Sequence, residues 1–263
     1  MLFRSPMYLT TQGLVLRAAA YNDTDVLLTL LTPNHGKLTV KARGLRRKNS
    51  PLTAPCQLLA YGEFTLFEYR SMYTINEAHS IELFAPLRRD LQKLSLGTYF
   101  AQAAELLSQE DLPNPELLSL VLNCLYALSN LDVTEQLVKS VFELRGACLA
   151  GYAPDLYGCH KCGNPFPDRF DIKEGRLECS ACRDHTSTGI RIPITGGMLE
   201  TMHYITTCDS KKLFSFSAGE DTLTQLSALT EGYLTTQLER GFSTLDFYKS
   251  LMIPFNNEGE NNV

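Results

Sequence analysis

Four of the eight cysteines are grouped into two Cys-x-x-Cys pairs. Cys159 and Cys162 form the first pair, and sixteen residues separate it from the second, Cys179 and Cys182. Two pairs at this separation are typical of a zinc ribbon, in which each pair turns two thiolates toward a shared Zn²⁺ ion. Four sulfurs fill a tetrahedral coordination sphere and leave no open position for a reacting water. The spacing therefore predicts one structural zinc ion per chain.

Other uses of these cysteines stay open at this point. His160 and His185 are nearby alternative ligands, and four unligated thiols or two disulfides are further alternatives. The remaining four cysteines are scattered among apolar neighbours, as expected of buried free thiols. Clustered cysteines suit a reducing cytoplasm. No apolar run has the length of a signal peptide or a membrane span, so we expect a cytoplasmic protein with no membrane partner.

A second group of residues with binding chemistry is a run of cations. The whole chain carries a formal net charge of −5. Residues 1–80 contain nine lysines and arginines and five acids, a charge of +4, so the rest of the chain carries −9. Such asymmetry indicates a polyanion-binding segment on an acidic body. Six of the nine cations lie within twelve residues: Lys37, Lys41, Arg43, Arg46, Arg47 and Lys48.

The pattern around these cations predicts a strand followed by a loop. Leu38, Val40 and Ala42 alternate with Lys37, Lys41 and Arg43, so the cations share the solvent face of the strand. The glycine, asparagine and proline in the next residues argue against a helix there. Cation clusters bind phosphate backbones through Coulomb attraction and counterion release. We therefore predict that all six cations bind nucleic acid; an ordinary solvated basic loop is the alternative.

The N-terminal third must position these cations. Short strands are predicted at residues 13–17, 25–31, 37–43, 63–69 and 73–78. Five strands in so short a segment suggest a small barrel, with an OB fold placed ahead of an SH3-like barrel. OB folds stack bases on aromatic side chains beside a basic groove. The aromatics available in this segment are Tyr61, Phe64, Phe67, Tyr69 and Tyr73.

The rest of the chain reads as helices. Asn114 followed by Pro115 predicts one helix start, and Asp132 with Glu135 predicts another as a capping box. Lys139 and Arg145 are expected on a helix surface. The predicted fold is multidomain α+β, with an OB-like barrel followed by a helical bundle that carries an inserted zinc ribbon. The expected divisions are an OB domain at 1–82, helices at 83–156, the ribbon at 157–188, helices at 189–255 and a disordered tail at 256–263.

No phosphate-binding glycine loop, zinc-protease motif or nucleophile elbow is present in the sequence. Together with a closed four-sulfur site, this favours a binding protein over an enzyme, and we expect no small-molecule substrate. A hydrolase is disfavoured on the same grounds. Within binding proteins, the rival to a DNA-binding protein is an adaptor whose barrel and ribbon bind other proteins without touching DNA.

Several runs resemble the RecO family of bacterial recombination mediators. They are Gly13–Arg17, Tyr21–Asp25, His35–Lys37, Lys41–Arg47, Phe142–Arg145 and Gly151–Leu156, and the similarity extends from about Gly13 to Ile253. The four cysteines match the zinc-bearing branch of that family, and the run from Lys37 to Lys48 matches its cationic OB segment. One departure is a C-terminal region poor in cations, which puts DNA contact there in doubt.

The resemblance implies a DNA repair protein that binds single- and double-stranded DNA and anneals complementary strands. It implies action with RecR and with the single-stranded DNA-binding protein to load the RecA recombinase, and it brings in RecF as a further partner. None of these properties follows from composition or spacing.

Overall fold

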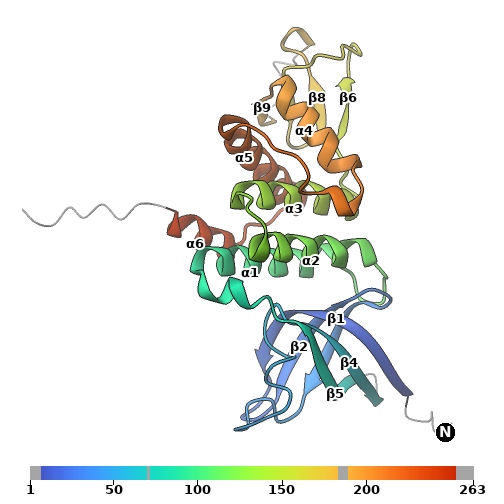
Figure 1. Ribbon diagram of the computed structural model, residues 1–263. Helices are drawn as coiled ribbons and strands as arrows, with labels where there is room; N and C mark the ends of the chain where they lie inside the picture. The colour runs from blue at the N-terminus through green and yellow to red at the C-terminus, as the bar shows by residue number, and fades with distance from the viewer. Residues whose placement is uncertain (1–6, 70–71, 183–188, 253–263) are drawn as a thin grey trace, which may run out of the picture.

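The structure, a computed structural model, describes residues 7–69, 72–182 and 189–252. A β-barrel lies at one end of the molecule, helices cross its middle, and a small sheet with the clustered cysteines lies at the other end (Figure 1). The segment predicted to be a disordered tail and the alternative ligand His185 fall outside the described residues.

The barrel contains five strands: β1 (Met7–Ala20), β2 (Val26–Thr32), β3 (Gly36–Ala42), β4 (Tyr61–Tyr69) and β5 (Met72–Glu82). Their order is β1-β2-β3-β5-β4, and β1 also pairs with β4 to close the barrel. The β3–β5 pair is parallel, whereas the other pairs are antiparallel. A parallel pair in a closed Greek-key barrel is the OB arrangement and excludes the all-antiparallel meander of an SH3-like barrel. The OB prediction is therefore confirmed.

Every second side chain of a strand points inward, and these apolar side chains fill the barrel. Leu38, Val40 and Ala42 of β3 are buried, as predicted, and Leu28 and Leu30 of the neighbouring β2 join them. β1 begins at Met7 because its first half pairs with β4. Its second half pairs with β2, with a register shift between Val15 and Arg17, so one long strand pairs with two neighbours and helps to close the barrel.

Helices form the middle of the molecule. The short η1 (Ala85–Arg89) leads into α1 (Leu91–Leu107), α2 (Pro115–Asn130) and α3 (Glu135–Leu149). Beyond the cysteine segment follow α4 (Gly196–Thr207), the turn η3 (Ser210–Lys212), α5 (Glu220–Gln237) and α6 (Ser243–Leu251). Among the helices that the structure describes, none is long and apolar enough to cross a membrane.

The two predicted helix starts had different outcomes. Asn114 caps α2 as predicted, with its side-chain oxygen accepting a hydrogen bond from the Leu117 N–H at 3.0 Å. The capping box at Asp132 is wrong. The chain stays extended up to Thr134, whose hydroxyl accepts from the Leu137 N–H at 3.3 Å and caps α3 instead. Thr134, directly before the first helical turn, thus has the capping role that was predicted for Asp132.

Segments far apart in sequence meet in the helical layer. α6, which lies in the predicted helical part 189–255 but was not predicted as an individual helix, packs against α1 (Figure 1). The Thr244 hydroxyl lies 2.6 Å from the Gln102 side-chain oxygen, and Gln92 donates to the Leu251 carbonyl at 3.2 Å. The end of the described chain therefore stabilises the helix that follows the barrel.

Two helix cations are engaged in contacts within the protein, Lys139 buried and Arg145 partly buried, which corrects the expectation that they face solvent. Lys139 is buried and pairs with the buried Glu143 at 3.0 Å and with Glu231 at 3.0 Å. Arg145 donates to the carbonyls of Ile205 and Thr206 at the end of α4, where a cation complements the helix dipole. Both side chains bind one helix to another.

The cysteine segment forms a four-stranded sheet. Its strands are β6 (Asp155–Cys159), β7 (Arg169–Asp171), β8 (Arg176–Glu178) and β9 (Arg191–Pro193), in the order β6-β8-β7-β9. The short η2 (Ser180–Cys182) follows β8. Phe170 packs on Tyr233 of α5 with ring centroids 5.4 Å apart. Arg191 pairs with Glu178 at 2.6 Å and with Asp171 at 3.3 Å, so it links β9 to β7 and β8.

Candidate nucleic-acid interface and metal centre

The structure divides the six predicted DNA-binding cations into two groups. Four of them are exposed and lie in the segment that directly follows β3; we call this group the basic loop: Arg43, Arg46, Arg47 and Lys48. Among the described residues, none of the four forms a salt bridge with a carboxylate. Their charge is therefore available to a polyanion.

The other two cations are engaged within the protein. Lys37 donates to the Glu105 carbonyl of α1 at 2.8 Å, next to an ion pair of 3.1 Å between Arg17 and the Glu105 carboxylate. Lys37 thus lies at the junction of the barrel and the helices. Lys41 pairs with Asp25 at 2.9 Å, and its side chain is 17% exposed.

Asp25 connects the turn between β1 and β2 to the basic loop, a role that the sequence analysis missed. One carboxylate oxygen accepts from the Gly44 N–H at 2.9 Å, and the other accepts from Lys41. The backbone N–H of Arg46 donates to the Thr24 carbonyl at 3.0 Å, which joins the same two segments a second time. The signal in the sequence is Asn22, whose side chain accepts from the Thr24 and Asp25 N–H groups in an Asx turn.

Gly44 is required by the conformation of this junction. Its φ of +66° is in the left-handed region, where a side chain is disfavoured. The turn that it allows brings its N–H onto Asp25 and directs the chain into the basic loop.

We expect Asp25 to make folding stability depend on pH in the acid range. The Gly44 N–H and the Lys41 ammonium hold the pKa of this carboxyl well below its ordinary value of 3.8. A lowered pKa stabilises the folded state above pH 3.8, and this contribution is lost as the pH falls through the folded-state pKa. The stability difference between the protein and its Asp25→Asn variant should stay constant above about pH 5 and shrink in more acidic solution. Urea denaturation at stepped pH measures it.

The control is Asp23→Asn, which removes a carboxylate of the same turn without touching these hydrogen bonds. A stability difference for Asp25→Asn that is unchanged from pH 6 down to pH 2.5 would contradict the assignment.

The five predicted stacking aromatics occupy different environments. Phe64 is fully buried in the barrel core. Tyr61 donates its hydroxyl to Gln12 at 2.6 Å, and Phe67 contacts Tyr8 with ring centroids 5.5 Å apart. The remaining two lie at the end of β4 and near the start of β5, with Tyr69 59% exposed and Tyr73 half-buried.

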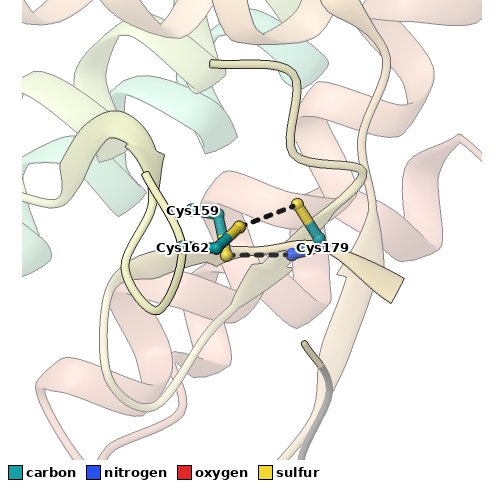
Figure 2. A group of neighbouring side chains, drawn as sticks. All are labelled: Cys159, Cys162 and Cys179. Atoms are coloured by element: carbon teal, nitrogen blue, oxygen red, sulfur yellow. Dashed lines mark hydrogen bonds between the residues drawn. The ribbon is translucent and has the colours of Figure 1, made fainter. Parts of the chain in front are cut away.

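Three of the four clustered cysteines converge. The sulfurs of Cys159, Cys162 and Cys179 lie within 4.8 Å of one another and could hold a metal ion (Figure 2). Cys162 and Cys179 are 4.0 Å apart between sulfurs. A tetrahedral site with Zn–S bonds of about 2.3 Å requires sulfurs about 3.8 Å apart, so this spacing fits zinc. Gly163, with φ +72°, supplies the tight turn of the first pair.

The fourth cysteine is a close neighbour of this group. Cys182 ends η2, and its N–H donates to the Cys179 carbonyl at 3.0 Å. Hydrogen bonding to the Cys162 thiol and desolvation raise the pKa of Cys182 to about 12. Its sulfur does not belong to the tight three-sulfur group. The structure thus brings three predicted ligands together and places the fourth beside them.

The surroundings of the Cys159 sulfur favour a thiolate. The Cys179 N–H donates to the Cys159 sulfur at 3.4 Å, and Asn164 donates to the Cys179 sulfur at 3.3 Å. Although desolvation opposes it, hydrogen bonding from backbone N–H groups lowers the pKa of Cys159 to about 6. By contrast, burial raises the pKa of the scattered Cys56 to about 12. Thiolates with N–H donors around them are suited to a soft or borderline metal such as zinc.

His160, the alternative ligand within the described residues, has both ring nitrogens near other groups. Nδ1 lies 3.1 Å from the Leu177 carbonyl, and Nε2 lies 3.8 Å from Glu178. The geometry therefore favours sulfur over this imidazole.

Comparisons with known proteins cover almost the whole chain. The family models "Recombination protein O N terminal" and "Recombination protein O C terminal" match residues 7–84 and 88–246. A DNA repair protein RecO from Acetivibrio thermocellus is 34% identical over 93% of this chain and 97% of its own length. One from Alkaliphilus metalliredigens is 29% identical over 93% of this chain and its full length. One from Bacillus pumilus is 29% identical over 75% and 78% of the two chains.

Proposed function

The chain belongs to the RecO family of DNA repair proteins, and from this premise we propose that it binds single- and double-stranded DNA through the basic loop. We further propose that it anneals complementary strands and helps to load the RecA recombinase on DNA coated by the single-stranded DNA-binding protein. The observation that carries the DNA-binding part is the group of four exposed cations on one turn of an OB barrel.

The basic loop supports annealing by a mechanism that needs no catalytic group. Guanidinium and ammonium groups bind phosphates and release counterions, which partly neutralises a strand. Two partly neutralised strands repel each other less, and base pairing supplies the driving force. Asp25 holds the loop in place through Gly44 and the β1–β2 turn. Lys37 acts at the junction with α1 and contributes to the shape of the site.

We propose that Cys159, Cys162, Cys179 and Cys182 hold one structural zinc ion. The ion would supply a rigid connection between the first cysteine pair, at the end of β6, and the second pair, after β8. The sheet and the helical layer are then the surfaces for protein partners. By family membership, these partners are RecR, the single-stranded DNA-binding protein and RecF, and the site of action is DNA in the bacterial cytoplasm.

Neutralising two cations of the basic loop tests the DNA-binding proposal. We expect Arg46→Ala with Arg47→Ala to weaken binding to oligonucleotides of any sequence. The slope of log affinity against log salt should flatten by about 1.4 for single strands and about 1.8 for duplexes, because two phosphate contacts are lost. Fluorescence anisotropy with a labelled oligonucleotide at several salt concentrations measures both effects.

The matched control is Lys211→Ala with Lys212→Ala, which removes the same charge from an exposed turn of the helical layer. Equal losses in both double variants would show a nonspecific effect of net charge. Unchanged affinity and slope in the Arg46 and Arg47 variant would remove the basic loop from the mechanism. A protein that binds no DNA at low salt would point instead to the adaptor function.

A further inference from the structure

Tyr21 is an exposed aromatic residue that the sequence analysis did not include among the stacking candidates. It follows β1 directly, in the turn that Asp25 connects to the basic loop. Its side chain is 51% exposed. The Lys41 ammonium lies 4.3 Å from the centre of the Tyr21 ring, in cation–π geometry. One face of the ring is thus occupied by a cation, and the exposed part of the ring is open to a ligand.

The position of Tyr21 is fixed by several contacts. Its backbone N–H donates to the Asp25 carbonyl at 3.0 Å. Lys41 is itself held by the Asp25 carboxylate at 2.9 Å, so its ammonium stays over the ring. Because Asp25 also accepts from Gly44, the same carboxylate sets the distance between the ring and the basic loop. A ring held in this way loses little conformational entropy when it binds a flat partner.

The chemistry of this arrangement suits an unpaired nucleobase. A base presents a π-face of any sequence, and its stacking on a tyrosine is insensitive to base identity. The Arg46 guanidinium donates to the Asn22 carbonyl at 3.3 Å, directly after Tyr21, so a cation lies beside the ring to bind the adjoining phosphate.

Other exposed aromatics in the described residues have different surroundings. Tyr8 contacts Phe67 on the side of the barrel formed by β1 and β4. Tyr157 lies on β6, in the sheet at the opposite end of the molecule, and contacts His203 (Figure 1). Tyr21 combines an exposed ring, a fixed position and adjacent cations.

We propose that Tyr21 is a base-stacking residue that binds one unpaired nucleobase of single-stranded DNA, with Lys41 as its positioning residue. This inference rests on the proposed DNA binding and adds a contact that phosphate recognition does not supply. It predicts a preference for unpaired over paired DNA at this position, because the bases of a duplex stack on each other.

The test compares two strands that differ only in their bases. One probe is a labelled dT oligonucleotide, and the other has the same length with abasic sites throughout. Tyr21→Ala should weaken binding to dT about five- to a hundredfold and leave the abasic strand unaffected. Tyr21→Phe, which keeps the ring, should bind dT nearly as well as the unmodified protein. The salt slope should not change, because no phosphate contact is lost.

A second measurement uses the absence of tryptophan from this chain. Tyr21→Trp places a single tryptophan at the proposed stacking position, and this tryptophan can be excited at wavelengths where tyrosine does not absorb; dT should quench its emission, whereas the abasic strand should not. The matched control is Tyr126→Trp on α2, where the native tyrosine is 53% exposed; its emission should not respond to either strand.

The two proposals fail in different ways. If Tyr21→Ala binds dT normally while the Arg46 and Arg47 variant has lost affinity, the stacking role is wrong and the DNA-binding function stands. Equal weakening of dT and abasic binding by Tyr21→Ala would also overturn stacking, since it would indicate a phosphate contact or a displaced loop. If no form of the protein binds either strand, the proposed function itself fails.

Discussion

Replacing Lys139 with methionine is expected to lower the free energy of unfolding by about 3–5 kcal/mol, because it leaves a buried carboxylate without its cation. Glu143 is fully buried, and the Lys139 ammonium lies 3.0 Å from it. Tyr99 and Thr230 also donate to Glu143, at 2.9 Å and 2.7 Å. These bonds join α1, α3 and α5, so the loss affects the centre of the helical layer. Urea denaturation followed by circular dichroism measures the change.

A second substitution separates the loss of charge balance from the loss of packing. Lys139→Met combined with Glu143→Gln removes both charges. The glutamine oxygen still accepts from one of the Tyr99 and Thr230 hydroxyls, and its NH2 group can donate to the other. We expect this double variant to recover more than half of the lost stability. Lys249→Met is the matched control, because Lys249 pairs with Glu231 at 2.7 Å but is 53% exposed; its cost should stay below about 1 kcal/mol.

The pH dependence gives a further check on the same network. Desolvation raises the pKa of Glu143. A buried carboxyl with a raised pKa destabilises the folded state when it is ionised, and this penalty disappears as the pH falls and the group binds a proton. The Lys139→Met variant should therefore be closer to the unmodified protein at pH 5 than at pH 8. A deficit that is equal at both pH values, or no greater than that of Lys249→Met, would contradict the role assigned to Lys139.

Removal of the metal is the second change that we expect to reduce stability strongly, here the stability of the β6–β9 sheet. Structural zinc binds zinc-finger peptides with an apparent free energy of about 10–16 kcal/mol, and that energy is largely folding energy. We expect the purified protein to contain one zinc ion per chain. Cys159→Ser should abolish zinc retention and unfold the β6–β9 sheet while the barrel stays folded. Metal analysis, together with hydrogen exchange of residues 155–193 and 7–69, measures both outcomes.

Two further cysteine variants make this experiment decisive. Cys208→Ser changes a scattered, half-buried cysteine and should leave the metal content unchanged. Cys182→Ser tests the fourth ligand and should reduce zinc retention as Cys159→Ser does. Full zinc content in Cys182→Ser would mean that three sulfurs and another group hold the ion. A protein with well under one zinc per chain would refute the metal site.

Local patterns predicted the elements that depend on neighbouring residues. The alternation in β3 identified its buried face, and the Asn114–Pro115 pair identified the start of α2. Local sequence patterns could not decide between two nearby residues that can both cap the same helix. Asp132 and Thr134 can both cap a helix, and the extended conformation at Thr134 decided for the second. α6 was not predicted as a separate helix, because it has only nine residues and its packing partner α1 is distant in the sequence.

The binding residues show the same division. The spacing of the cysteines and the density of cations near position 40 are properties of the sequence alone, and they identified the chemistry of both sites: thiolate ligation and phosphate binding. Which cations remain free was decided by tertiary contacts. Lys37 lies against α1 and Lys41 against Asp25, although both were predicted on the same solvent face as Arg43. Tyr21 acquired its place beside the basic loop in the same way, through Asp25.

By itself, therefore, the sequence determined the kinds of residue, their spacing and the periodicity that builds each strand and helix, because these depend on contacts between near neighbours. The tertiary structure decided the strand order of the barrel, the burial of Lys139 and the separation of the six cations into held and exposed groups. Each of these depends on contacts between residues many positions apart, such as Lys139 with Glu231 and Lys37 with Glu105. The free energy of such contacts appears only when the chain has folded.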